Sequence, residues 1–97
     1  MLTSKNRAQL RAMASKLDPI FQVGKGGVTA NMLSQLDDTL EAREIIKCRV
    51  LETCPASVDQ VANAVAEQLD SYVVQVIGRI FVIYRESVKN KVIQLED

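Results

Sequence analysis

Cys48 and Cys54 are the only thiols in the chain, and histidine is absent. A structural zinc site needs four nitrogen or sulfur ligands, so two sulfurs are too few. Histidine-based acid–base catalysis and a Ser-His-Asp triad are excluded because they need an imidazole. The carboxylates Asp37, Asp38 and Glu41 have the spacing of a solvated helix face. The residue types therefore predict a protein that is not an enzyme and that holds no metal or cofactor.

A glycine-rich segment, Gly24-Lys25-Gly26-Gly27, lies between a predicted short strand and a predicted helix. Backbone N–H groups at the start of a helix attract anions, and glycines let a polymer backbone approach closely. The spacing fits neither G-x-x-x-x-G-K-[ST] nor G-x-G-x-x-G. It does contain G-x-x-G, which KH domains use to clamp single-stranded backbones. An ordinary tight turn between a strand and a helix is the alternative.

Charge is unevenly distributed along a chain whose 12 Lys and Arg balance its 12 Asp and Glu. Residues 1–28 carry five cations and one acid, whereas residues 29–46 carry one cation and four acids. If the acidic helices cover one face of the sheet, Lys47 and Arg49 point out of the other, near Arg7 and Arg11. Charges are screened beyond roughly 8 Å at about 0.15 M salt, so a local basic surface attracts phosphates despite the neutral total. The alternative is that these charges only keep the protein soluble.

The 97 residues predict a single domain of the α/β class, spanning residues 1–97. Apolar periodicity and capping residues predict three helices, and β-rich runs predict four strands in the order helix, strand, helix, strand, helix, strand, strand. Gly78-Arg79 has the form of a type II′ turn joining the last two strands. The alternation predicts a four-stranded mixed sheet. Arg43 falls on the buried stripe of the second helix, and residues 86–97 are expected to form a flexible tail.

The expected location is the cytoplasm. Cations interrupt every apolar run in residues 1–17, which therefore do not resemble an export signal, and no stretch of 18 apolar residues is present. The two cysteines could form one disulfide, but in the cytoplasm we expect both thiols to stay reduced. We expect no membrane partner and a monomeric protein.

Several segments together resemble the bacterial YhbY-like proteins, which are single-domain members of the CRM group (chloroplast RNA splicing and ribosome maturation). They are residues 2–5, 22–27, 40–47, 76–79 and 82–85. The match runs in order over about residues 2–87, nearly the whole chain, so it is more specific than any one motif. It implies a fold similar to the C-terminal domain of bacterial translation initiation factor three. It also implies an RNA-binding surface and association with ribosomal RNA in precursors of the large ribosomal subunit.

The resemblance and the charge pattern together give a set of predicted RNA-binding residues: Gly24, Lys25, Gly26, Gly27, Lys5, Arg7, Arg11, Lys47, Arg49, Arg79 and Arg85. Structural roles are the alternative for several of them. Arg79 fits the tip of a turn, Lys47 and Arg49 could pair with carboxylates, and Arg85 fits an edge charge that blocks strand addition. Ribosomal proteins are further expected partners. A second class of function is a protein-interaction module that docks on a ribosomal or GTPase partner through a sheet edge or the acidic helices.

Overall fold

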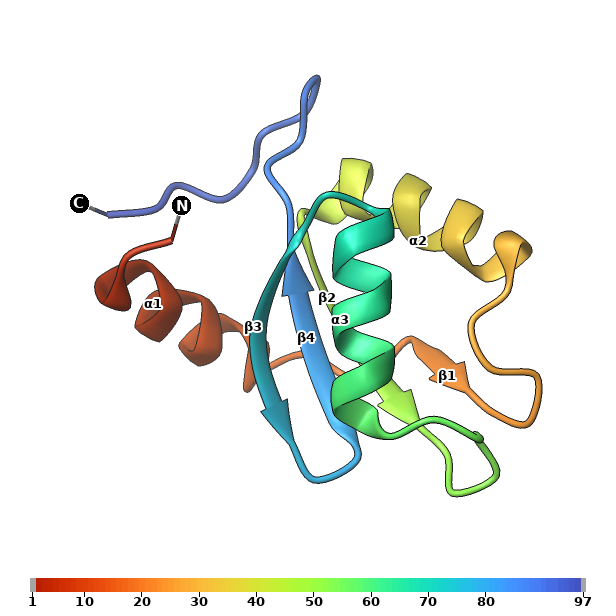
Figure 1. Cartoon of the computed structure of the whole chain (residues 1–97). Helices are drawn as coiled ribbons and strands as arrows, with labels where there is room; N and C mark the ends of the chain where they lie inside the picture. Colours follow the sequence, from red (N-terminus) through yellow and green to blue (C-terminus); the bar gives the residue numbers. More distant parts are fainter. Residues whose placement is uncertain (1, 97) are drawn as a thin grey trace.

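The computed structural model describes residues 2–96 as a four-stranded sheet with helices on both faces (Figure 1). The helices are α1 (Ser4–Ala14), α2 (Ala30–Arg43) and α3 (Val58–Gln68); the strands are β1 (Phe21–Val23), β2 (Ile45–Val50), β3 (Tyr72–Ile77) and β4 (Ile80–Tyr84). The strand order is β1-β2-β4-β3, with β1 and β2 parallel and the other two pairs antiparallel. The predicted mixed-sheet α/β fold is confirmed.

Local sequence signals decide where the elements begin and turn. Thr3 and Ser57 form capping boxes at the starts of α1 and α3, and the Thr29 hydroxyl accepts the N–H of Met32 at the start of α2. Each cap satisfies an N–H group that has no partner within the helix. Gly78 alone has positive φ (57°) in the two-residue turn between β3 and β4, as a type II′ turn requires.

The sheet separates two apolar clusters because side chains alternate between its faces. Ile46, Cys48 and Val50 of β2 pack with α2 and α3 on one face. Ile45 packs with Val82 and other residues around α1 on the opposite face. The acidic helices and the basic first helix therefore cover opposite faces of the sheet, as the charge pattern predicts.

Both cysteines are buried free thiols. Burial raises the pKa of the Cys48 thiol to about 12. A thiol with so high a pKa is not ionised near neutral pH and is a poor nucleophile or metal ligand. Cys48 is thus a core residue, as its alternation in the strand predicts.

The C-terminal segment, residues 85–96, forms no helix or strand but is attached to the domain, unlike the loose tail that the sequence suggests. Glu44 has no exposed surface, and its carboxylate accepts the N–H groups of Ser87, Val92 and Ile93 at 2.6–2.7 Å. Ile93 is buried in the cluster around α1. Because these contacts join residues more than 40 positions apart, the sequence gives no local sign of them.

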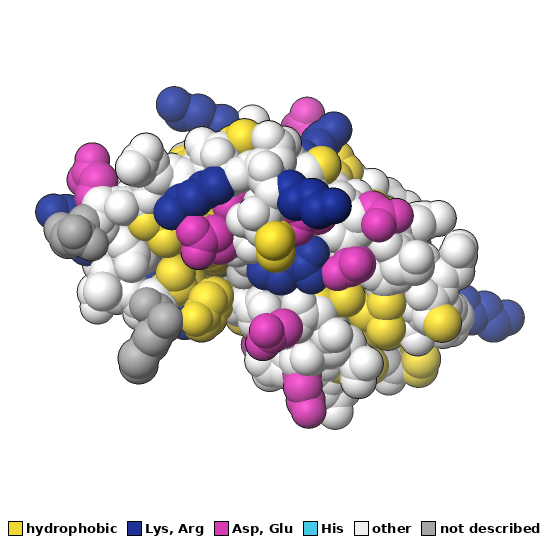
Figure 2. Space-filling model, turned by 90° about the horizontal axis from the view of Figure 1, so that it is seen from above, with side chains coloured by type: hydrophobic (Ala, Val, Ile, Leu, Met, Phe, Trp, Pro, Cys, Tyr) yellow, Lys and Arg dark blue, Asp and Glu magenta, His cyan; other side chains and the backbone are white. Residues whose placement is uncertain are grey.

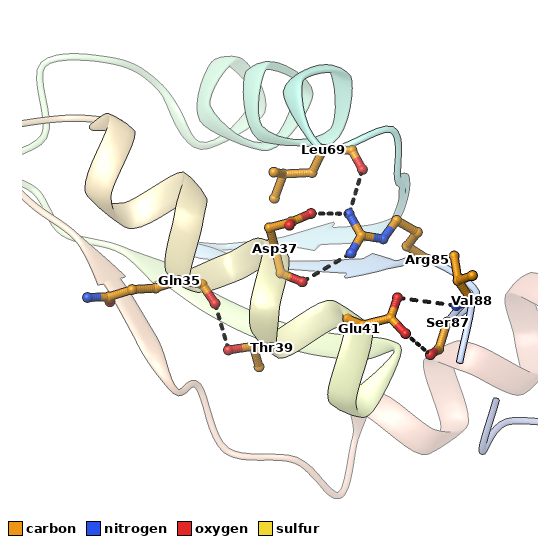
Figure 3. A network of polar contacts seen from close by, with 8 residues as sticks. All are labelled: Gln35, Asp37, Thr39, Glu41, Leu69, Arg85, Ser87 and Val88. Atoms are coloured by element: carbon orange, nitrogen blue, oxygen red, sulfur yellow. Dashed lines mark hydrogen bonds and ion pairs between the residues drawn. The ribbon is translucent and has the colours of Figure 1, made fainter. Parts of the chain in front are cut away.

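A second carboxylate, Glu41, holds the beginning of the same segment (Figure 3). It accepts the Ser87 hydroxyl at 2.5 Å and the N–H groups of Val88 and Lys89. Asp37, one turn earlier, pairs with Arg85 at 2.6 Å. The expectation that Asp37 and Glu41 only face solvent is therefore wrong, because both have partners from the end of the chain.

Acid is expected to weaken the tail contact through Glu41. Its hydrogen bonds to Ser87, Lys89 and Val88 lower its pKa to about 2. A carboxyl pKa below its unfolded value of about 4.3 stabilises the fold above that pH, and the contribution is lost as pH falls toward about 2. Glu41→Gln should therefore melt below wild type near neutral pH, and the difference in Tm should shrink with acidification. Exposed Glu67→Gln is the matched control, and a Glu41→Gln difference that is independent of pH would contradict the assignment.

Candidate functional site

The glycine segment forms a tight turn that leads from β1 into α2. The Gly27 N–H donates to the Gly24 carbonyl at 2.9 Å, and Gly27 has φ of 66°. A Cβ at Gly24 would lie 3.4 Å from the Leu51 side chain, whereas one at Gly26 or Gly27 would meet no atom within 4 Å. The turn thus packs on one side and presents bare backbone on the other, with Lys25 exposed between. Ligand binding by this turn remains a prediction.

Three connections meet at the same end of the sheet (Figure 1). Because β1 and β2 are parallel, the glycine turn and the segment after β2 lie side by side, and the Leu51 N–H donates to the Val23 carbonyl at 2.8 Å. The β3–β4 turn joins them because β4 runs antiparallel to β2. Two carboxylates are exposed here, Glu52 in the segment after β2 and Asp59 in the first turn of α3, so this corner is not purely cationic.

Arg79 fastens the β3–β4 turn to β2. Its guanidinium donates to the carbonyls of Val50 and Leu51 at 2.8 and 2.7 Å, and its own carbonyl accepts the Val50 N–H. The planar fork of arginine suits two neighbouring carbonyls. Arg79 therefore sets the position of the hairpin tip, a structural role that the sequence offers only as an alternative.

Helix α1 covers only half of its face of the sheet. The buried cluster beneath it contains Ile45, Val74, Val82 and Tyr84, all toward the end of the sheet that carries the C-terminal segment. The register places a further set of side chains on this face, from the level of Val82 toward the glycine turn: Gln22, Arg49, Gln75, Ile77 and Ile80. Arg49 and Gln22 are exposed, and Ile77 is 61% exposed. We call these five residues the open sheet surface.

The two flanks of α1 have different partners. On one flank, Asn6 and Gln9 bond to Glu96 and Gln94 of the C-terminal segment. That segment runs beside α1 on the side away from the β3–β4 turn (Figure 1). Helical spacing places Arg7 and Arg11, one turn apart, on the other flank, toward the open sheet surface. Arg7 also donates to the Val73 carbonyl at 2.7 Å, so its side chain is held at the β3 edge.

The structure brings together only part of the predicted site. Arg49 lies on the open sheet surface, Arg7 and Arg11 border it, and the glycine turn and Arg79 lie at its end. Lys47 shares the face, but its ammonium group donates to the Leu17 carbonyl at 3.0 Å, below the end of α1. Lys5 lies one turn from Gln9, on the side of α1 away from Arg7 and Arg11.

Arg85 lies away from this group. Its guanidinium bonds to the Asp37 carboxylate and the carbonyls of Asp37 and Leu69, which ties α2 to the end of α3 (Figure 3). It follows β4, at the end of the sheet opposite the glycine turn. Cations and acids are intermixed over that end of the molecule (Figure 2). The structure therefore does not bring Arg85 to the other predicted site residues.

Sequence reasoning missed the apolar part of the open sheet surface. Ile77 and Ile80 read as ordinary strand residues, but Ile77 is exposed and Ile80 is only half-buried, because α1 is short. An 11-residue helix is about 16 Å long, so it covers a limited part of a sheet face. A comparison of the length of α1 with the area of the sheet face would have revealed these residues.

Arg43 differs from its predicted place on the buried stripe of α2. It is exposed and lines a hollow of about 360 Å³ with Ile20, Phe21 and Asp38, between α2 and the start of β1.

Within residues 2–96, no three His, Cys, Asp or Glu side chains are placed to share a metal ion. Nor does any helix in that range have the length and apolar character to cross a bilayer.

The fold and this site define a small α/β domain that combines a half-open sheet face, bordering arginines and a bare glycine turn. A family model described as the CRS1 / YhbY (CRM) domain matches residues 2–85. The chain therefore belongs to the CRS1/YhbY (CRM) domain family, as its sequence resemblance predicts.

Relatives match along nearly the whole chain. A Bacillus subtilis protein named "Probable RNA-binding protein YqeI" is 50% identical over 95 residues, which cover 98% of this chain and 99% of that protein. A Haemophilus influenzae protein named "RNA-binding protein" is 30% identical over 91 residues, covering 94% and 92% of the two chains. The solution structure of SAV1595 from Staphylococcus aureus superimposes with a TM-score of 0.81 at 50% identity, covering 99% of this chain and all of that one.

Removal of the Arg79 side chain is expected to loosen the hairpin tip. Arg79→Ala loses two hydrogen bonds to carbonyls, and we expect the free energy of unfolding to fall by about 1–2 kcal/mol in urea denaturation. Arg49→Ala removes the same charge from the neighbouring strand and should change stability by less than about 0.5 kcal/mol. Equal effects of the two substitutions would argue against the structural role of Arg79.

Proposed function

We propose that this chain is a non-enzymatic RNA-binding protein that acts as a cytoplasmic monomer and assists assembly of the large ribosomal subunit. It holds ribosomal RNA through phosphate contacts, with the glycine turn fitted against the backbone. Little base-specific reading is expected, since positively charged side chains mainly position the nucleic acid.

The observation that carries this proposal is the arrangement around the open sheet surface. Arg7, Arg11 and Arg49 come from α1 and β2, which are distant in sequence, and lie on one side of the sheet. Lys25 and the bare glycines lie at the end of the same surface. A backbone turn without side chains allows a phosphate chain to approach, and the cations neutralise it.

The relatives support the RNA part of the proposal, because the Bacillus and Haemophilus proteins are named for RNA binding. The ribosomal part rests on the resemblance to YhbY-like proteins. The acidic helices are less suited to docking a protein partner, because the carboxylates of Asp37 and Glu41 already have intramolecular partners.

Charge reversal at Lys25 tests the phosphate contact. Neutralising about four phosphates predicts that log affinity falls with log salt with a slope of roughly −3 to −4. Lys25→Glu should weaken binding to transcribed large-subunit RNA fragments roughly tenfold near 0.1 M salt and reduce the slope by about 1. Lys89→Glu makes the same charge change on the C-terminal segment and should bind like wild type. Filter binding of all three proteins checks this, and equal affinity of Lys25→Glu and wild type would remove the turn from the site.

Nuclease treatment tests the ribosomal partner. The tagged protein should sediment with large-subunit precursors in a cell lysate, and RNA digestion should release it before the particles lose their proteins. Lys25→Glu should reduce the bound fraction. Association that survives digestion and is insensitive to Lys25→Glu would favour docking on a ribosomal protein or a GTPase.

A further inference from the structure

We infer that the open sheet surface receives an unpaired stretch of RNA, with a base or ribose lying against Ile77 and Ile80. This inference rests on the proposed RNA binding and adds which form of RNA the site takes. Arg49 and the glycine turn hold the adjoining phosphates.

The first reason is the apolar surface itself. Ile77 is 61% exposed although it lies in a regular strand, and Ile80 stands directly opposite it on β4. The Gly78-Arg79 turn beyond them is fixed by the two bonds of Arg79 to carbonyls near the end of β2. The two isoleucines therefore form a firm apolar contact area at the hairpin tip.

The second reason is what surrounds this area. Arg49 pairs in register with Ile80 and is exposed beside it, while Gln22 and Gln75 supply hydrogen-bonding groups on the same face. Arg7 and Arg11 border the other side, on α1. The surface thus combines apolar contact with positive charge, which complements a partner that carries both flat apolar groups and phosphates.

Charge also argues against a second copy of this chain as the occupant. A two-fold contact through Ile77 would bring Arg49 of one copy close to the Arg49 region of the other. Like charges facing one another across an interface oppose association. A polyanion meets no such repulsion.

A fully paired RNA helix fits the surface less well than an unpaired strand. Paired bases are stacked within the helix and leave mainly phosphates, sugars and groove edges on the outside. The exposed Ile77 and the half-buried Ile80 would gain little from such a partner. An unpaired strand offers its base faces, and a four-stranded sheet is wide enough for two or three bases in other RNA-binding folds.

The contact is expected to tolerate any base. The described aromatic residues on this face are Tyr84, which is buried under α1, and Tyr72, at the far end of β3. Isoleucine makes apolar contact without the hydrogen bonds that distinguish bases. The surface therefore distinguishes unpaired from paired RNA and does not select a particular base sequence.

Ile77→Thr tests the inference, because it keeps β-branching but replaces the ethyl arm of the side chain with a hydroxyl. The probes are a 12-nucleotide unstructured RNA and a fully paired hairpin of similar composition. Ile77→Thr should weaken binding of the unstructured RNA about five- to tenfold, the lower part of the range for a base on an aromatic ring, with an unchanged salt slope. Binding of the paired hairpin should stay within about twofold of wild type.

Two control variants make the outcome specific. Val88→Thr changes an 89% exposed residue at the opposite end and should bind both RNAs like wild type. Ile77→Val should restore most of the affinity because it keeps the apolar surface. Circular dichroism and thermal unfolding should show that all variants remain folded, as expected for exposed positions.

The possible results separate this inference from the proposed function. If Ile77→Thr binds unstructured RNA like wild type while Lys25→Glu still weakens binding, RNA binding stands and the apolar contact is wrong. Equal losses on both RNAs would overturn the preference for unpaired strands. A concentration-dependent dimer that Ile77→Thr abolishes would assign the surface to a second copy. Absence of RNA binding by wild type would overturn the proposed function itself.

Discussion

The short first helix is the constraint on which the rest of the site depends. A sheet with apolar side chains on both faces needs other segments packed over each face. Helices α2 and α3 together cover one face. The other face has only α1, with its 11 residues, and the C-terminal segment. Their apolar side chains bury the half of the face around Ile45, Val74 and Tyr84. The half around Ile77 and Arg49 therefore stays open, beside the connection that contains the bare glycines.

Some cations of the chain hold the fold, and others lie on or near the open sheet surface. Arg79, Arg85 and Lys47 donate to backbone carbonyls between different elements, and Arg85 also pairs with an acid. Arg11, Lys25 and Arg49 are exposed on or near one side of the sheet. A net charge of zero is therefore compatible with a locally cationic surface, because several acids contact the tail or Arg85 at the far end of the molecule.

The sequence predicted the parts of the fold that depend on neighbouring residues. The capping residues, the Gly78-Arg79 turn and the alternation of side chains in β2 are all local signals, and each gave the correct element. The tail attachment could not be predicted, because Glu44 meets backbone groups more than 40 residues away. For the same reason, the pattern of charge along the chain did not reveal that the Arg85 guanidinium pairs with Asp37.

The tail and the candidate site are physically linked through α1. Glu44 and Glu41 fix the path of residues 87–93, and the segment that follows bonds to Asn6 and Gln9 on one flank of α1. A helix held along one flank and against the sheet has a defined rotation about its axis. That rotation directs Arg7 toward the carbonyls of β3 and places Arg11 on the same flank of α1, toward the open sheet surface. The buried carboxylate at one end of the molecule thus helps to position positive charge near the other, although the two never touch.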